Sequence, residues 1–195
     1  GYVYGGPNAA DRVDFDSVTH VAWHQFDIDA FGNIYDYANW TTYYEEFVTA
    51  AHAAGVKVHL TVMPYNEDGS SPLSKMRSAL LNPTYRANMV EQLSDLVNDY
   101  GADGVNIDFE MLESDTFDEL VAFTAEMAAE VDEVYVSTPT VDWGNGYDYD
   151  ELAFASDGLV IMGYDHHSVG SNPGPVSIFD DADSFWPYWD IQWAL

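Results

Sequence analysis

The sequence predicts an α/β fold that is built around parallel strands. Short apolar runs alternate along the chain with longer amphipathic stretches, which is the pattern of strand–helix repeats. The runs are almost continuously apolar, as expected for parallel strands that are buried on both faces. The chain has 195 residues, enough for one ordinary domain. We therefore treat residues 1–195 as one domain, and either a (β/α) barrel or a doubly wound sheet fits this pattern.

Six segments are predicted to be strands. Glycine, asparagine and proline residues mark where the early ones end: Gly5-Gly6-Pro7 follows the first, Gly32-Asn33 the second and Pro64 the third. In chain order, the predicted strands cover residues 2–4, 19–27, 56–63, 104–110, 134–138 and 159–164.

Three amphipathic stretches are predicted to be helices. The first covers Trp40–Ala54. The second starts at Asn82-Pro83, a capping side chain followed by proline in the first turn, and ends before Gly101. The third opens with the capping box Thr116-x-x-Glu119 and carries apolar residues as far as Val131. Each helix lies between two predicted strands, which supports the strand–helix repeat.

Polar residues at the ends of the predicted strands favour a barrel over a doubly wound sheet. No Gly-x-Gly-x-x-Gly follows a strand and no phosphate loop is present, which argues against a nucleotide-binding sheet. In a barrel, catalytic groups lie at the carboxyl ends of the strands. Asp108 and Glu110 end the fourth predicted strand, and the sixth leads into Tyr164-Asp165-His166-His167. We therefore expect a (β/α)8 barrel of the TIM type.

The number of strands predicts that this barrel is incomplete. A complete TIM barrel has eight strands and typically about 250 residues, whereas six strands are predicted here. Residues 166–195 are rich in glycine, proline and aromatic residues and do not add two strand–helix units. An open barrel would expose apolar strand edges. We therefore expect residues 1–195 to be the N-terminal three-quarters of a catalytic barrel, completed by further sequence or by another chain.

The charge balance excludes nucleic acid as a partner. The chain has 34 acidic and 5 basic residues and a net charge of −29, whereas phosphate binding needs the opposite charge. No apolar run is long enough to predict a membrane span. The absence of cysteine excludes disulfides. Because acidic residues occur along the whole chain, we expect a secreted protein from a high-salt environment, where salt screens self-repulsion. An ordinary acidic secreted protein is the alternative.

The most informative segment is Asp103-Gly-Val-Asn-Ile-Asp-Phe-Glu110. Apolar and polar residues alternate in it, so Asn106, Asp108 and Glu110 would share one face of a strand. Neighbouring carboxylates repel each other and burial raises their pKa values, which is how a glutamate becomes a general acid near neutral pH. The segment therefore predicts an acid–base site. A structural salt-bridge cluster is the alternative, but basic partners are scarce in this chain.

This segment resembles the signature of family 18 glycoside hydrolases, the chitinase-like enzymes, whose fourth barrel strand carries Asp-x-x-Asp-x-Asp-x-Glu. Met162-Gly-Tyr-Asp165 is similar to the sixth-strand motif Met-x-Tyr-Asp of that family, and Gly174-Pro175-Val176 is similar to its branch of spore-cortex glucosaminidases. The likeness covers almost the whole chain, since the first three strands of the family resemble residues 1–4, 19–29 and 56–63.

The resemblance implies hydrolysis of β-1,4-linked N-acetylglucosamine polymers, chitin or a related glycan, by a substrate-assisted retaining mechanism. Glu110 would protonate the leaving glycosidic oxygen while the N-acetyl oxygen of the substrate attacks the anomeric carbon. Asp108 would hold the acetamido N–H, and Tyr164 would donate its hydroxyl to the acetamido oxygen. No cofactor and no metal ion is implied.

Further residues are predicted to contact the polysaccharide. Tyr4, Phe26 and Trp143 lie near strand ends, where aromatic faces would stack on sugar rings. Asn106 stands where many family members carry Asp; an amide cannot take a proton from Asp108, so the pH profile would change. The predicted substrate-binding residues are Tyr4, Phe26, Asn106, Trp143, Met162 and Asp165.

Two other functions fit the same residues. One is a carbohydrate-binding barrel without catalysis, as in lectin-like members of the family, which have usually lost the acid. The other is a metal-dependent hydrolase in which His166 and His167 join the two carboxylates as ligands. His24 and His59 lie within predicted strands and are expected to be hydrogen-bonded core residues.

Overall fold

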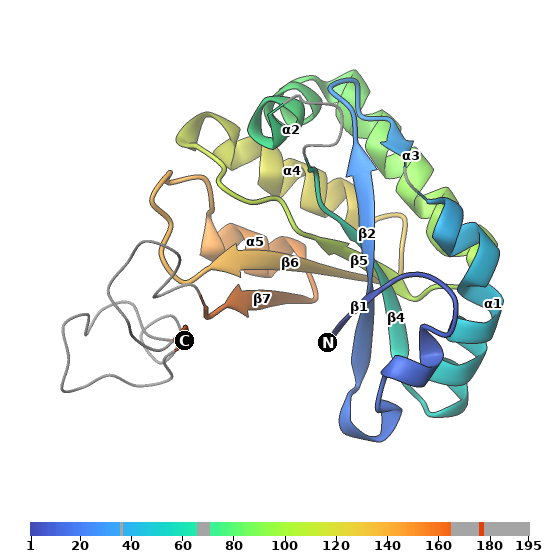
Figure 1. The fold of residues 1–195 in the computed structure, drawn as a ribbon. Coiled ribbons are helices and arrows are strands. Elements are labelled where there is room, and N and C mark those ends of the chain that lie inside the picture. Colours follow the sequence, from blue (N-terminus) through green and yellow to red (C-terminus); the bar gives the residue numbers. More distant parts are fainter. Residues whose placement is uncertain (36, 66–70, 165–175, 178–195) are drawn as a thin grey trace, which may run out of the picture.

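Six parallel strands form the centre of the fold, in the order β1-β2-β4-β5-β6-β7 (Figure 1). The computed structural model describes residues 1–35, 37–65, 71–164 and 176–177. A two-residue strand, β3 (Ile34–Tyr35), pairs antiparallel with the end of β2. All six predicted strands are confirmed, and β3 is additional. The parallel strands are β1 (Tyr2–Tyr4), β2 (His20–Ile28), β4 (Lys57–Val62), β5 (Gly104–Ile107), β6 (Glu133–Pro139) and β7 (Gly158–Met162).

The α-helices of the described residues lie on one side of the sheet (Figure 1). Those predicted from the sequence are confirmed as α1, α3 and α4, whereas α2 and α5 were not predicted. None of the helices in this part of the chain is long and apolar enough to cross a membrane. The helices are α1 (Ala38–Ala53), α2 (Pro72–Leu81), α3 (Pro83–Tyr100), α4 (Phe117–Ala128) and α5 (Tyr149–Ala155), with short 3-10 helices η1 (Ala10–Arg12), η2 (Phe15–Ser17) and η3 (Ser114–Thr116).

The predicted caps explain both ends of α3 but not the start of α4. The Asn82 side chain accepts a hydrogen bond from the backbone N–H of Thr84 at 3.0 Å. Gly101, with a left-handed φ of 71°, ends the helix. At α4, by contrast, the Thr116 hydroxyl donates to the carbonyl oxygen of Glu113 at 3.0 Å. Thr116 therefore does not cap the helix with its side chain, and the predicted capping box is wrong.

A hydrogen bond across the sheet shows that the strands curl into part of a barrel. β1 and β6 are separated by four strand spacings, which would be about 19 Å in a flat sheet. The hydroxyl of Tyr2 on β1 nevertheless lies 3.1 Å from the hydroxyl of Ser137 on β6. The parallel strands thus form a curled half-barrel (Figure 1), which confirms the predicted fold class.

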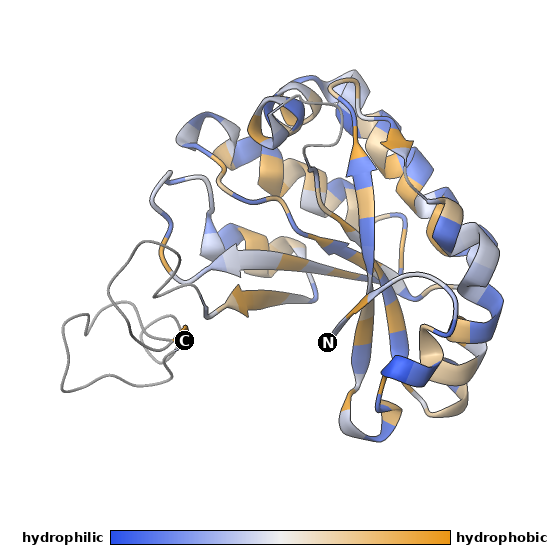
Figure 2. Ribbon diagram, in the orientation of Figure 1, coloured by the Kyte–Doolittle hydropathy of each residue, from blue (hydrophilic) through white to orange (hydrophobic). Residues whose placement is uncertain are grey.

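The two faces of the curled sheet differ in polarity, and hydrophobic and hydrophilic residues alternate along β2 (Figure 2). On the convex face, Trp23, Leu60, Val105 and Val134 stand in register and are buried beneath the helices. The ring of Trp23 lies 5.2 Å from that of Trp40 on α1. Polar side chains occupy the concave face, among them His20, His24, His59, Asn106, Asp108, Glu133 and Ser137.

A buried ion pair attaches α2 to the sheet. Lys75 Nζ lies 3.1 Å from Asp27 Oδ2 and donates to Tyr35 Oη at 2.7 Å and to the Tyr65 carbonyl at 2.9 Å. The side chains of Lys75 and Asp27 are 1% and 0% exposed. Because a charged residue occupies a buried position of α2, the apolar pattern of this helix is interrupted, and the sequence did not predict it.

Candidate active site

The polar residues Asn106 and Asp108, at the carboxyl end of β5, face the concave side of the sheet. Val105 and Ile107 are fully buried on the convex side, so alternation turns Asn106 and Asp108 to the concave side. β5 is hydrogen-bonded to β4 and to β6, and the N–H of Asp108 extends the pairing by donating to the Val62 carbonyl at 2.9 Å. The backbone of Asp108 is therefore fixed by the sheet.

Ser137 on β6 connects the polar side chains of this face. Asn106 Nδ2 donates to Ser137 Oγ at 3.3 Å, and the Tyr2 hydroxyl lies 3.1 Å from the same atom. Ser137 also interacts with the Asp108 carboxyl group and lowers its pKa. Three strands thus place their polar groups around one buried hydroxyl. Ser137 and Tyr2 were not singled out from the sequence, because the pairing of distant strands brings them together.

Asp108 is a buried acidic residue, with 7% of its surface exposed. Burial raises the pKa of Asp108 above its ordinary value, and the hydrogen bond with Ser137 opposes this shift in part. Among the residues that the structure describes, none makes a hydrogen bond to Asp108 Oδ1. A buried polar atom without a partner costs folding free energy. Such an atom two residues before Glu110, which lines a cleft, marks Asp108 as a candidate functional residue.

Glu110 borders a cleft at the carboxyl ends of β5, β6 and β7. The cleft has a volume of about 670 Å³, within the range of ligand pockets, and Trp143, Met162 and Tyr164 also line it. Glu110 itself is half-buried. Burial and then the nearby charge of Glu110 raise the pKa of the Tyr147 hydroxyl. A carboxyl group, a phenol and an indole thus meet around a space that can hold a sugar.

The loop that follows β6 is hydrogen-bonded to the residues at the end of β5. The Tyr147 hydroxyl donates to the backbone carbonyl of Phe109, and the Asp142 carboxylate accepts from the N–H groups of Gly144 and Tyr147 at 3.2 and 2.9 Å. Trp143 lies between these anchored residues and is 75% exposed. Trp143 lines the cleft, and these hydrogen bonds hold its loop in place. Tyr147 was not predicted from the sequence.

The structure brings together most of the residues predicted from the sequence. Glu110, Trp143, Met162 and Tyr164 line one cleft, whereas Asn106 and Asp108 are buried on the concave face and are not among its lining residues. Tyr4, which is 71% exposed, contacts the ring of His24 and is not part of the cleft lining. Asp165, like His166 and His167, lies outside the described residues. The catalytic and substrate-binding roles of these residues stay predictions.

Phe26 does not reach the concave face, and its predicted contact with substrate is wrong. The pairing of β2 with β4 shifts register between His24 and Phe26. Such a bulge changes which residues face each side. Phe26 therefore lies on the convex side, where it is fully buried and its ring lies 6.4 Å from that of Trp40.

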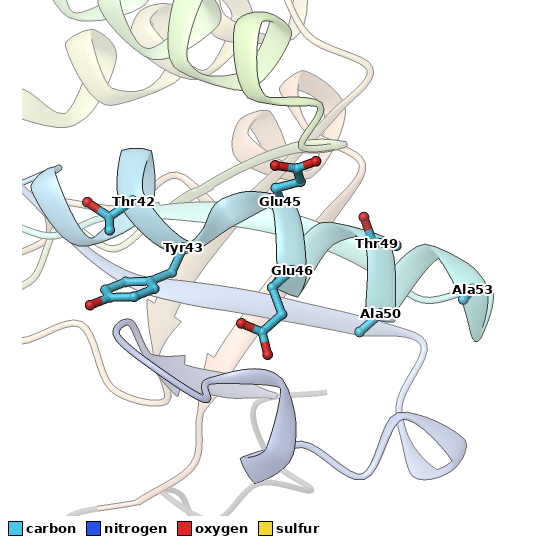
Figure 3. A pocket seen from close by; sticks show the side chains of 7 residues that line it. All are labelled: Thr42, Tyr43, Glu45, Glu46, Thr49, Ala50 and Ala53. Carbon is cyan, nitrogen blue, oxygen red and sulfur yellow. The ribbon is translucent and has the colours of Figure 1, made fainter.

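A second hollow, of about 530 Å³, lies on the outer surface of α1 (Figure 3). All of its lining residues belong to this one helix, and Tyr43 and Glu46 point to the same side of it (Figure 3). None of the residues predicted to act on substrate belongs to this lining, so the cleft beside β5 is the candidate site.

Comparison with known proteins agrees with this geometry. The family described as glycosyl hydrolases family 18 matches residues 2–194, which is nearly the whole chain. The chain belongs to family 18. The expectation drawn from its acidic segment is therefore confirmed at the level of the family.

Among relatives of this family 18 chain is the Bacillus subtilis (strain 168) protein YdhD, provisionally named a sporulation-specific glycosylase. It is 34% identical over 111 residues, which are 52% of this chain and 26% of that protein. The crystal structure of YdhD is 28% identical, with a TM-score of 0.72 over 82% of this chain and 55% of that chain. A Group IV chitinase of Ostrinia furnacalis in complex with allosamidin, 18% identical, shares the fold with a TM-score of 0.82 over 99% of this chain and 60% of that chain. The chain thus spans about a quarter of the curated relative and little more than half of the solved chains.

Proposed function

We propose that this chain carries the acid–base residues of a glycosidase that cleaves β-1,4-linked N-acetylglucosamine polymers, with chitin as the first substrate. The observation that carries the proposal is Asp108, a buried carboxyl group with a raised pKa that lies two residues before Glu110 at the cleft. Membership of family 18 supports glycoside hydrolysis. The names of the relatives, a glycosylase and a chitinase, support this class of glycan.

In the proposed reaction, Glu110 is the general acid. It is half-buried and borders the cleft, so it can reach a glycosidic oxygen bound there. Glu110 protonates the leaving oxygen while the N-acetyl oxygen of the substrate attacks the anomeric carbon and displaces it. The ionised Glu110 then takes a proton from the water that opens the resulting ring, so the configuration is retained and the acid is restored.

Asp108 is proposed to hold the acetamido group during this attack. Its Oδ1, which has no hydrogen-bond partner among the described residues, would accept the acetamido N–H. The substrate would then supply the hydrogen bond that the folded protein lacks, and the developing positive charge would favour the ionised carboxylate. Tyr164, which is 51% exposed at the cleft, would donate its hydroxyl to the acetamido oxygen.

Asn106 is proposed to position Asp108 through Ser137 and not to exchange protons with it. Its amide donates to Ser137 Oγ, and Ser137 in turn lowers the pKa of Asp108. An amide has no acidic proton to give or accept at neutral pH. The proton balance of the site would therefore rest on Asp108 and Glu110 alone.

Secretion into a high-salt environment is part of the proposal. The net charge of −29 supports it, because molar salt shortens the screening length to about 3 Å and weakens self-repulsion. The polysaccharide substrate is the proposed partner. Activity should therefore be measured at high salt.

The proposal is tested with the full-length protein and a chromogenic chitobioside in concentrated NaCl. Glu110→Gln should lower kcat by about 10²–10⁴-fold, the usual contribution of a positioned general acid. The control is Glu46→Gln, the same chemical change on the outer surface of α1, which should leave kcat unchanged. Absence of turnover by the wild-type protein, or full turnover by Glu110→Gln, would refute the proposal. Tight binding of chitooligosaccharides without turnover would favour the carbohydrate-binding alternative instead.

A further inference from the structure

Two histidines and a glutamate meet at the amino-terminal ends of the strands, on the concave face. His59 Nε2 lies 3.0 Å and His20 Nε2 lies 3.2 Å from the same atom, Glu133 Oε2. The ligand atoms of the three residues all lie within 4.8 Å of one another. Because Asp108 is four residues beyond Gly104, which pairs with Glu133, this cluster lies about 13 Å along the strands from Asp108.

Gly104 allows these side chains to meet. On β5 it pairs with His59 of β4 on one side and with Glu133 of β6 on the other. Two strand spacings, about 9.6 Å, would separate the backbones of those partners. A Cβ atom at Gly104 would lie 2.1 Å from the Glu133 carbonyl oxygen, so no larger residue fits there without movement. The glycine leaves the space in which His59 and Glu133 come into direct contact.

Two of the three ligand separations are close to the edge of a metal-ligand tetrahedron, and the separation of the two histidine nitrogens is within 4.8 Å. Ligands at about 2.1 Å from a tetrahedral ion lie about 3.4 Å apart. The observed separations of 3.0 and 3.2 Å need only a small opening to admit an ion. Two imidazoles with one carboxylate form a donor set that suits zinc and other transition metals better than magnesium or calcium.

The surroundings keep this donor set ordered and able to bind. His59 is buried, with 3% of its surface exposed, and Glu133 is half-buried, so the surrounding residues hold both side chains in place. The ring of Tyr135 packs against both histidines, 5.4 Å from the ring of His20 and 5.1 Å from that of His59. Lys57 pairs with the other oxygen of Glu133 and leaves Oε2 to the histidines.

We propose that His20, His59 and Glu133 form a binding site for a divalent transition-metal ion of the zinc class, separate from the cleft. The ion would fasten β2, β4 and β6 to one another across the concave face. The sequence predicted no metal ion and placed His59 among ordinary core residues, because the three ligands are distant in the chain. The site is structural, so the chemistry at Glu110 does not depend on it.

The test measures Zn²⁺ binding to the full-length protein by calorimetry, after chelator treatment, in concentrated NaCl with excess Mg²⁺. The salt and Mg²⁺ suppress non-specific binding to this acidic chain. We expect one Zn²⁺ ion bound per protein molecule and a melting temperature that rises by roughly 5 °C or more at saturation. His20→Ala should bind Zn²⁺ at least about tenfold more weakly than the wild type. His20 is the most exposed of the ligands, so this variant should fold.

His52→Ala is the matched control, because His52 also pairs with a carboxylate, Asp103, at 2.8 Å. Among the described residues, His52 does not belong to a cluster of three possible metal ligands. This variant should bind Zn²⁺ like the wild type. In NMR spectra, Zn²⁺ should shift the ring signals of His20 and His59 and leave those of His52 in place. Equal affinity in wild type and His20→Ala, or binding of Zn²⁺ no tighter than Mg²⁺, would overturn the proposal.

Discussion

Replacing Lys75 by methionine should destabilise the fold more than any change of a surface charge. The ammonium of Lys75 lies within 3.1 Å of Asp27, Tyr35 and the Tyr65 carbonyl, and its side chain is 1% exposed. Lys75→Met would leave the carboxylate of Asp27 buried without its counter-charge. Breaking a buried pair in this way costs about 3–5 kcal/mol. For a chain of this length, each kcal/mol lowers Tm by about 2–4 °C, so the expected loss is roughly 6–20 °C.

The same helix supplies the control. Arg77 also forms ion pairs, with Glu113 and Asp115, but its side chain is 35% exposed. Exposed pairs contribute about 0–1 kcal/mol, so Arg77→Met should change the unfolding free energy by no more than that. Urea unfolding of both variants, followed by circular dichroism at fixed salt, gives the two free energies.

A double variant separates the ion pair from the packing of the lysine chain. Asp27→Asn combined with Lys75→Met removes both charges, so it should be more stable than the sum of the single losses predicts. The reasoning is refuted if Lys75→Met costs no more than Arg77→Met. It is also refuted if the losses of Asp27→Asn and Lys75→Met simply add, since contact between the charges would then carry no energy.

Two further predictions concern the cleft. The raised pKa of Asp108 means that the folded protein holds this proton more tightly than the unfolded chain, so ionisation above the ordinary aspartate pKa destabilises the fold. The unfolding free energy of Asp108→Asn should therefore match that of the wild type in acid and exceed it by about 0.5–2 kcal/mol toward neutral pH. Urea unfolding at several pH values measures this difference. Equal stability of the two proteins at every pH would contradict the prediction. Trp143 is 75% exposed, so Trp143→Ala should change the unfolding free energy by no more than about 0.5 kcal/mol from the wild type. The same variant should bind chitooligosaccharide about tenfold more weakly, as measured by calorimetry. Unchanged affinity would exclude stacking of a sugar ring on this indole.

Local sequence patterns predict most of the strands and helices of this fold. The six parallel strands follow from apolar runs between turn residues, and α3 follows from its caps at Asn82 and Gly101. α5 carried a local signal that was overlooked: Asp148 accepts from the N–H of Glu151 at 3.0 Å and caps the helix. α2 is different, because its buried Lys75 makes sense only once Asp27 is known to lie opposite.

For the candidate site, the sequence predicts which side chains of one strand share a face. It does not predict which side chains of different strands are neighbours. Alternation placed Asn106 and Asp108 on one face correctly. Phe26 was chosen because it lies near a strand end, and the register shift in β2, a property of strand pairing, could not be read from that position. Ser137 could not be found from its neighbours in sequence, since its importance comes from the pairing of β5 with β6.

The partners of Ser137 limit which atom donates and which accepts in each of its hydrogen bonds. A serine hydroxyl has one proton to donate and two lone pairs to accept with. The Asn106 amide donates to Ser137 Oγ. An ionised carboxylate can only accept, so when Ser137 gives its proton to Asp108, whose pKa it lowers, the Tyr2 hydroxyl must donate to Ser137 as well. The hydroxyl is thus saturated, and donation runs one way, from β1 through β6 to β5. When Asp108 takes up a proton, the serine proton is free to turn elsewhere, so the charge of one carboxyl group is coupled to the orientation of a tyrosine on the first strand. Threonine at 137 would keep this coupling, whereas alanine would abolish it.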